Sequence, residues 1–243
     1  MKKSIIVILV LMVGMFIEAG KLHYIAKGTL VGTMIDAQVQ YSAGKSRYSI
    51  KVKMRATGIV KMLSGGQVET HTSSGRIKNG EYFAKEYKIE KRFKNIHYLR
   101  RYLFDYKRKK ITKIATKWEN GKKLYENKET LKYFAHNDIL TLYHNIVRYK
   151  KKHASGHFAI ALAGAEKEGG KLKFFFPSGK KLENERKILS EVSAGIIKVY
   201  MRRTFLSGGK GNLTFAIDKH GIAGKVVLDS VKVLGKVVLK RIR

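Results

Sequence analysis

Apolar and polar residues alternate along most of this 243-residue chain. A period of two places successive side chains on opposite faces of a strand, so this pattern predicts sheets with one buried and one solvated face. Asn120-Gly121 predicts a hairpin turn, because both residues tolerate positive φ. Short strands separated by glycine turns favour antiparallel meanders that curl into a barrel or sandwich. The predicted strands include Tyr48–Ala56, Phe83–Phe93, Ile96–Tyr106, His157–Leu162, Lys171–Phe176, Gly195–Phe205, Asn212–Asp218, Lys225–Val231 and Lys236–Ile242.

The segment from Phe134 to His153 departs from this alternation, because its apolar residues recur three and four positions apart. That spacing predicts an amphipathic helix. Asn137 or Asp138 can cap its N-terminus, and the basic residues from Arg148 onward suit its negative end. The predicted apolar face consists of Ile139, Leu142, Tyr143, Ile146 and Tyr149. The predicted fold class is therefore mainly β: an antiparallel curved sheet or half-barrel wrapped around one long central helix.

The N-terminal segment resembles a secretory signal. Lys2 and Lys3 precede an apolar run, Ile5–Ile17, and Ala19 offers a small residue for cleavage before Gly20. The run is shorter than the ~20 residues of a membrane span, although an uncleaved anchor is the alternative. We therefore expect a signal peptide over residues 1–19 and a single β-rich periplasmic domain over residues 20–243. The absence of cysteine excludes disulfides and lipid attachment to a cysteine.

The chain is strongly basic, with 51 Lys and Arg against 18 Asp and Glu and a net charge of +33. Such a field attracts anionic surfaces and opposes self-association, so a monomer is expected. For an exported protein those surfaces are membrane headgroups, lipopolysaccharide and cell-wall polymers. Lys91–Lys113 interleaves aromatic and basic residues. Strand alternation explains that pattern, so no nucleic-acid partner is predicted.

The short motifs do not indicate catalysis. Leu63–Gln67 spells LSGGQ and Gly44-Lys45-Ser46 resembles part of a phosphate-binding loop, but the context of each favours a glycine-rich hairpin turn. The chain contains neither H-E-x-x-H nor G-x-S-x-G. No catalytic residue, metal site or cofactor is predicted. If the protein were an enzyme acting on envelope carbohydrate, the carboxylates of Asp105, Asp138 and Glu183 would be the first candidates.

Several segments together resemble one family of exported bacterial proteins. They are Tyr24–Tyr41, Ser73-Ser74-Gly75, Phe104-Asp105, Asp138-Ile139-Leu140-Thr141 with Arg148, Phe176-Pro177-Ser178-Gly179, and the closing stretch from Leu213. The chain resembles the family called domain of unknown function 3108, in which Ser is usual where this chain has Thr141. The resemblance gives Asp138, Arg148, Pro177 and Gly179 structural roles. It implies a periplasmic β-domain curved around a helix, much as lipoprotein carriers and lipocalins are, and implies no activity.

The function that we expect is non-catalytic binding of an apolar or amphipathic, lipid-like envelope molecule. Tyr143, Ile146 and Tyr149 on the helix, with Phe174 and Phe176 opposite, are predicted to line the cavity. Lys150, Lys151 and Lys152 are predicted to contact an anionic membrane or cell-wall surface. The alternatives are a structural or scaffolding envelope protein that binds anionic glycan, and the carbohydrate enzyme considered above.

Overall fold

The computed structural model describes residues 19–152, 156–166, 169–189, 194–201, 211–218, 222–231 and 234–242. The predicted signal peptide lies outside these residues apart from Ala19, which begins the first strand. Among the described residues, no helix combines the length and the apolar character needed to cross a membrane.

One sheet of 15 strands runs through the described residues. Its order is β8-β7-β6-β5-β4-β3-β2-β1-β15-β14-β13-β12-β11-β10-β9, and every pairing is antiparallel except the short parallel contact of β9 with β10. Three helices complete the described fold. The elements are β1 (Ala19–Gly28), β2 (Gly32–Ala43), β3 (Arg47–Ala56), α2 (Gly58–Ser64), β4 (Val68–Lys78), β5 (Glu81–Phe93), β6 (Ile96–Asp105), β7 (Lys110–Glu119), β8 (Lys122–Thr130), β9 (Asn137–Asp138), α3 (Ile139–Lys152), β10 (Gly156–Ala163), β11 (Lys171–Phe176), α4 (Gly179–Leu189), β12 (Gly195–Met201), β13 (Gly211–Ile217), β14 (Ala223–Val231) and β15 (Gly235–Arg241).

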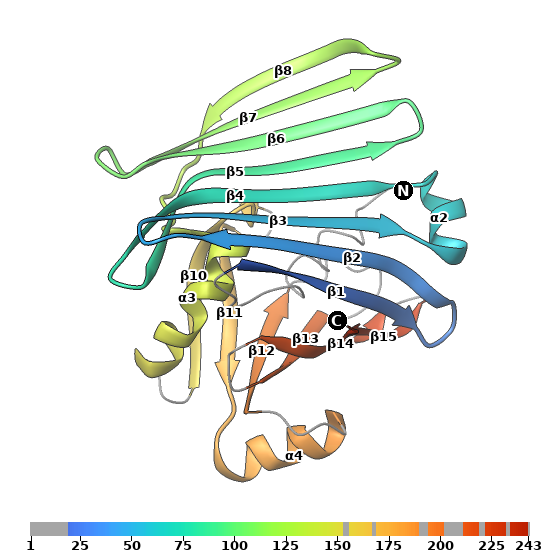
Figure 1. The fold of residues 1–243 in the computed structure, drawn as a ribbon, viewed down its shortest axis with the longest axis vertical. Coiled ribbons are helices and arrows are strands. Elements are labelled where there is room, and N and C mark those ends of the chain that lie inside the picture. The colour runs from blue at the N-terminus through green and yellow to red at the C-terminus, as the bar shows by residue number, and fades with distance from the viewer. Residues whose placement is uncertain are drawn as a thin grey trace.

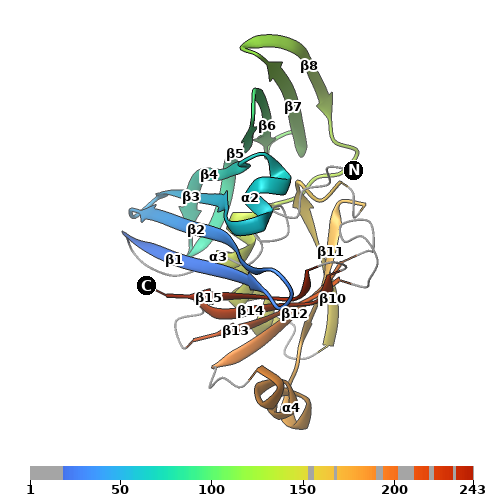
Figure 2. The same ribbon diagram turned by 90° about the vertical axis from the view of Figure 1, so that its right-hand side faces the viewer.

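The sheet is curved but not closed. The long strands β1–β8 form its upper part in Figure 1, β10–β15 form its lower part, and α3 lies between the two parts in both ribbon views (Figures 1 and 2). Strands β6–β8 extend beyond the region that α3 covers, and every residue of β8 is exposed. The predicted fold class, a mainly β curved sheet around one helix, is confirmed.

Local sequence explains most strand ends. At the predicted hairpin, Asn120 and Gly121 have φ values of 50° and 78°, which only a few residue types adopt at low cost. Strand β11 covers the predicted residues Lys171–Phe176. Strand β12 was predicted to reach Phe205, but the residues after Met201 lie outside the described part of the chain.

Helix α3 is buried on all sides in its first two turns. Every residue from Ile139 to Ile146 is buried, including Thr141, His144 and Asn145. The prediction that only one face would be buried is therefore wrong for this half of the helix. The polar residues find partners in the sheet instead: the His144 ring stacks between Tyr41 and Tyr82, at ring-centroid distances of 4.8 and 4.4 Å.

The N-terminus of α3 is capped as predicted by Asp138. Its Oδ1 accepts hydrogen bonds from the backbone N–H groups of Leu140 (2.7 Å) and Thr141 (3.0 Å). The Thr141 hydroxyl oxygen accepts the Asp138 N–H in return, at 2.8 Å. This reciprocal pair is a capping box, with Thr141 in the place where Glu or Gln is usual. The fully buried Oδ2 accepts the Ser73 hydroxyl at 2.6 Å, which ties the helix to β4.

Asn145 joins α3 to an open strand edge. The ladder between β5 and β6 begins at Glu86, so the first residues of β5 have no strand on that side. There the Asn145 side chain accepts the Tyr82 N–H at 2.9 Å and donates to the Tyr82 carbonyl at 2.9 Å. Its amide therefore takes the place of a neighbouring strand and satisfies both backbone groups.

The alternation pattern did not predict α2 and α4. The LSGGQ motif forms no hairpin turn, because α2 ends at Ser64 and Gly65 caps it in the left-handed conformation, with φ 69°. The turn predicted around Gly44-Lys45-Ser46 does join β2 to β3. Helix α4 is highly charged and packs mainly through Leu189, in a small cluster with Ile196, Ala216 and Val227. Its Lys, Leu, Glu and Arg residues favour helix by intrinsic propensity rather than by apolar spacing.

We predict that Asn145→Ala lowers the free energy of unfolding by about 2–4 kcal/mol, because it leaves the buried N–H and C=O of Tyr82 without partners. Asn127→Ala on the exposed strand β8 is the control and should change stability by less than about 0.5 kcal/mol. Urea denaturation measures both variants. Equal stabilities would contradict the role of Asn145.

A second prediction concerns pH. Burial raises the pKa of Asp138 to about 6, although hydrogen bonds from Ser73 and from the helix N–H groups favour its charged form. The native state then holds a proton that the unfolded state loses near pH 4, so this residue's contribution to the unfolding free energy falls as the pH rises from 4 to 6.

Asp138→Asn keeps a capping side chain but does not titrate. The wild-type unfolding free energy minus that of Asp138→Asn should therefore fall by about 2.4 kcal/mol between pH 4 and pH 7. Burial lowers the pKa of His144 to about 3, which has the opposite effect on stability, but both proteins contain His144 and the subtraction removes it. If the difference in unfolding free energy between the two proteins did not change with pH, the raised pKa of Asp138 would be refuted.

Candidate binding groove

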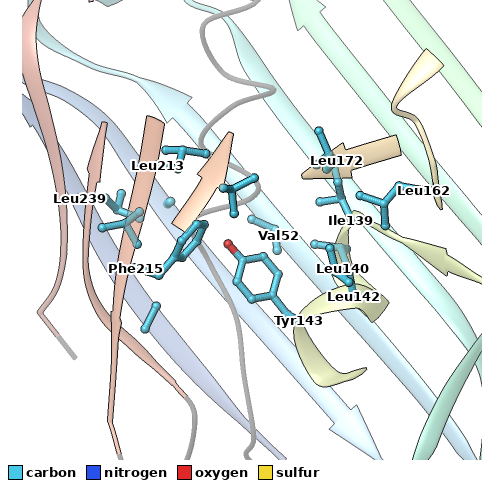
Figure 3. Close-up of a cluster of buried hydrophobic side chains, with 14 of the residues drawn as sticks. Val52, Ile139, Leu140, Leu142, Tyr143, Leu162, Leu172, Leu213, Phe215 and Leu239 are labelled. Atoms are coloured by element: carbon cyan, nitrogen blue, oxygen red, sulfur yellow. The ribbon is translucent and has the colours of Figure 1, made fainter. Parts of the chain in front are cut away.

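The predicted apolar site lies between α3 and the lower part of the sheet. Tyr143, Ile146 and Phe174 line one apolar cavity there, together with four residues that were not assigned to the site: Leu142, Ile197, Val199 and Phe215. Figure 3 shows the Tyr143 ring directed from the helix toward Phe215, and the two ring centroids are 5.7 Å apart. The cavity volume is about 20 Å³. That space holds about one water molecule, whereas small-molecule pockets measure roughly 300–1,000 Å³.

Two predicted ligand residues do not line this cavity. Tyr149 is half-buried, and its hydroxyl accepts a hydrogen bond from Asn137 Nδ2 at 2.8 Å. Phe176 is buried against Phe158, at a ring-centroid distance of 5.0 Å. Neither residue lines this cavity, because periodicity gives the face of an element but not the position of its end relative to a cavity. Lys150–Lys152 form the last turn of α3, and their side chains lie outside the described part of the structure.

The four residues that the family resemblance marked lie in or next to α3 and α4. Asp138 caps α3, as described above. Arg148 Nη1 donates to the carbonyl of Asn79, at 2.6 Å, and so holds the β4–β5 turn against the helix. Pro177 is buried after β11, and Gly179 begins α4 with a φ of 53°.

The concave side of β4 carries a buried polar network. The Glu69 and His71 side chains are fully buried. His71 Nε2 lies 2.7 Å from Glu69 Oε1, and Nδ1 lies 2.6 Å from the Tyr87 hydroxyl. In one neutral tautomer, Nε2–H donates to the carboxylate and Nδ1 accepts the Tyr87 hydroxyl, so every group has a partner. Because the network is closed to solvent, we assign it to the core.

The large open site is a groove on the outer side of β3–β6, with a volume of about 840 Å³. It lies where β6 separates from the first residues of β5. We call it the basic groove. Its walls contain three cations, a group of aromatic side chains and one acid. The lining residues are Arg47, Tyr48, Ser74, Gly75, Arg76, Phe83, Ala84, Lys85, Phe104, Asp105 and Tyr106.

Strand register brings the cations of the groove together. Arg47 and Arg76 are direct cross-strand partners of β3 and β4, so their side chains leave the same face of the sheet. The Arg76 guanidinium lies over the rings of Phe83 and Tyr106, with its central carbon 5.6 and 5.5 Å from their centroids. Within the described part of the chain, Arg47, Arg76 and Lys85 form no ion pair. Two like charges directly opposite each other are unfavourable without an anion between them.

Backbone geometry shapes the floor of the groove. The β4–β5 register shifts between Ser74 and Gly75, which is a β-bulge. A Cβ atom at Gly75 would lie 2.0 Å from the carbonyl oxygen of Phe83, so only glycine permits this close approach. At the far wall, the Tyr106 hydroxyl donates to the carbonyl of His136 at 3.2 Å, and burial raises the Tyr106 pKa.

The three carboxylates considered for catalysis do not meet. Asp138 is fully buried in the helix cap. Asp105 lines the basic groove and accepts the Arg108 N–H at 2.9 Å. Glu183 is exposed on α4, which lies at the bottom of Figure 1, whereas β6 lies near the top. The described residues also contain no group of three or more His, Cys, Asp or Glu side chains that could hold a metal ion.

The fold is similar to the crystal structure of a β-barrel-like protein of domain of unknown function DUF1849 from Brucella abortus, with a TM-score of 0.54. The match covers 93% of this chain and 96% of that chain at 10% identity, so it shows a shared fold alone. No protein-family model matches the sequence, and no curated protein matches it. The resemblance to family 3108 therefore stays a prediction, whereas the β-barrel-like architecture is shown.

The apolar cavity gives a stability test. Val199→Ile adds one methylene beside the cavity, and we expect the free energy of unfolding to rise by about 0.8 kcal/mol if that space is empty. Val226→Ile is the control, because Val226 is fully buried in β14 and does not line the cavity. That control should lower stability by about 1–3 kcal/mol through overpacking. Thermal denaturation measures the stability of both variants. A loss of stability in Val199→Ile would show that the cavity is not empty.

Proposed function

We propose that this protein is an exported, non-catalytic binding protein of the cell envelope. Its ligand carries phosphate or carboxylate groups beside an apolar ring or chain, and it binds in the basic groove. The observation that carries the proposal is the open groove in which Arg47 and Arg76 face each other beside Phe83 and Tyr106. Arginine suits such a ligand because its planar guanidinium binds phosphate and carboxylate with two hydrogen bonds and stacks on aromatic faces.

Charge supports this ligand class. The net charge of +33 raises the local concentration of anions near the surface, and the groove adds fixed donors at a defined place. Asp105 is the one acid in the lining. Its carboxylate accepts the Arg108 N–H of the following turn, which holds it at the end of β6. An anion that bridges the two arginines would also remove their mutual repulsion.

Two arguments favour binding over catalysis. The candidate carboxylates do not face a common cleft in the described structure. In addition, the buried pair of Glu69 and His71 is closed to solvent, so no substrate reaches it without unfolding of the sheet. A periplasmic location rests on the predicted signal peptide.

A second candidate function is binding of an apolar chain beneath α3. It is favoured by the observation that Tyr143, Ile146 and Phe174 do line an apolar cavity. An acyl chain would enter only if α3 moved away from β12 and β13. Delipidated protein that binds a fluorescent fatty acid, and loses this binding in Val199→Ile, would support this function.

The groove is tested by a pair of charge-reversal variants. Arg47→Glu with Arg76→Glu changes two groove residues, whereas Lys51→Glu with Arg55→Glu changes two exposed residues of β3 outside it. Each double variant lowers the net charge by four, from +33 to +29. Any difference in ligand affinity between the two double variants is therefore caused by the groove residues rather than by total charge.

Isothermal titration with two soluble ligands measures affinity: de-acylated lipopolysaccharide oligosaccharide, and short-chain phosphatidylglycerol below its micelle concentration. We expect the groove variant to bind at least about tenfold more weakly than wild type, because two charge-assisted contacts are lost. The control variant should stay within about threefold. Tighter binding of the oligosaccharide would indicate a glycan ligand, whereas tighter binding of phosphatidylglycerol would indicate a lipid headgroup. Equal losses in both variants would refute a site in the groove.

A further inference from the structure

Exposed apolar side chains gather at one end of the long strands. The three most exposed large hydrophobic residues of the described chain are Met62 (81%), Leu63 (74%) and Leu30 (71%). Met62 and Leu63 are on α2 together with Ile59, which is 47% exposed, and Leu30 is in the turn between β1 and β2. Exposed apolar clusters on proteins that carry a strong charge mark interaction surfaces.

Backbone contacts hold α2 and this turn at the same end. The Thr57 N–H, just before α2, donates to the carbonyl of Met34 near the start of β2, at 2.8 Å. Figure 1 places α2 and the β1–β2 turn at the right-hand end of the sheet, and both face the viewer in Figure 2. Val60 is the one buried residue of α2, so a single anchor holds the helix while its other apolar residues point outward.

Lysines surround these apolar residues. Four turns at this end, residues 27–33, 57–67, 93–96 and 234–236, contain four lysines and neither Asp nor Glu, whereas the adjoining β7–β8 turn follows Glu119. Lys27, Lys61, Lys94 and Lys236 are all exposed. The Lys94 N–H donates to the Gly65 carbonyl at 3.3 Å, and the Thr29 N–H donates to the Lys236 carbonyl at 3.0 Å, so both lysines lie next to the apolar residues.

We propose that this end, which we call the α2 tip (Leu30, Ile59, Met62 and Leu63 with Lys27, Lys61, Lys94 and Lys236), docks the protein on an anionic lipid bilayer. The apolar side chains enter the boundary between headgroups and acyl chains. The lysines contact the lipid phosphates, and their long aliphatic stems allow the ammonium groups to stay in water. The four turns that carry these residues contain no acid, and Glu119 beside the adjoining β7–β8 turn lies 3.3 Å from the ammonium group of Lys117, so the charge next to the apolar residues is positive and favours an anionic lipid surface.

The tip is separate from the basic groove. Arg47 begins β3 and α2 follows its last residue, Ala56, so the two sites lie at opposite ends of that strand. A strand of 10 residues spans about 33 Å, which holds the groove well away from a docked membrane. Docking therefore goes beyond the proposed function, and each can fail without the other.

Vesicle flotation tests the docking. Leu30→Ser, Met62→Ser and Leu63→Ser are combined in one tip variant, and Leu124→Ser, Ile188→Ser and Ile242→Ser in a control that removes three exposed apolar side chains elsewhere. On vesicles of phosphatidylglycerol and phosphatidylethanolamine, we expect the tip variant to partition at least about tenfold less than wild type, and the control within about twofold. Binding of the groove ligands should be unchanged in the tip variant.

Lysine substitutions test the charge. Lys61→Gln with Lys94→Gln should weaken vesicle binding by about fivefold per lysine at low salt, and pure phosphatidylcholine vesicles should bind wild type weakly. Equal binding of the wild-type protein and the tip variant would overturn the proposal. So would self-association of the free protein that the tip variant abolishes, because the tip would then bind a second copy.

Insertion has a direct spectroscopic readout, because the chain contains no cysteine. Met62→Cys and Ile188→Cys each provide a single site for an environment-sensitive fluorophore. On anionic vesicles the label at position 62 should shift to the blue and gain intensity, whereas the label at position 188 should not change. An unchanged label at position 62, or equal shifts at both positions, would overturn insertion of the tip.

Discussion

The fully buried carboxylate of Asp138 connects the helix of this protein to its sheet. One oxygen caps the first turn of α3 and the other accepts the Ser73 hydroxyl of β4, which itself lies 3.1 Å from the Tyr48 hydroxyl of β3. A buried carboxylate is costly unless all its acceptor sites are used, so this position in the fold specifies one orientation of the helix. Asn145 fixes the same helix a second time, on the open edge of β5.

These two contacts explain why the sheet does not need to close. A curved sheet of 15 strands leaves an open edge where β6 turns away from β5, and an unpaired edge is a site for unwanted pairing. Helix α3 covers part of that edge with a side-chain amide instead of a strand. The remaining interior fills with apolar side chains from both parts of the sheet, and the space left beneath the helix is about 20 Å³. A filled interior leaves the outer surface as the place for ligands.

The outer surface carries the excess of positive charge, and the strands distribute it. The same alternation that points Tyr48, Ile50 and Val52 inward points Arg47, Lys51 and Arg55 outward. Several of the outward cations pair with a neighbouring glutamate, as Lys88 and Arg101 do with Glu86. They meet aromatic side chains in a groove where a bulge at Gly75 and the departure of β6 open the sheet, and they lie beside exposed aliphatic residues at the turns near α2.

The sequence alone determined the elements whose signals are local. Alternation identified β3 and β11, Asn120-Gly121 identified a hairpin, and Asp138 identified the start of α3, because each depends on neighbouring residues. The tertiary structure alone decided which residues form the basic groove and which polar residues of α3 are buried. The pairing of Arg47 with Arg76 depends on a register between strands, and the burial of His144 and Asn145 depends on two parts of the sheet enclosing one helix. Such contacts join residues far apart in the chain, and no periodicity within a single segment specifies them.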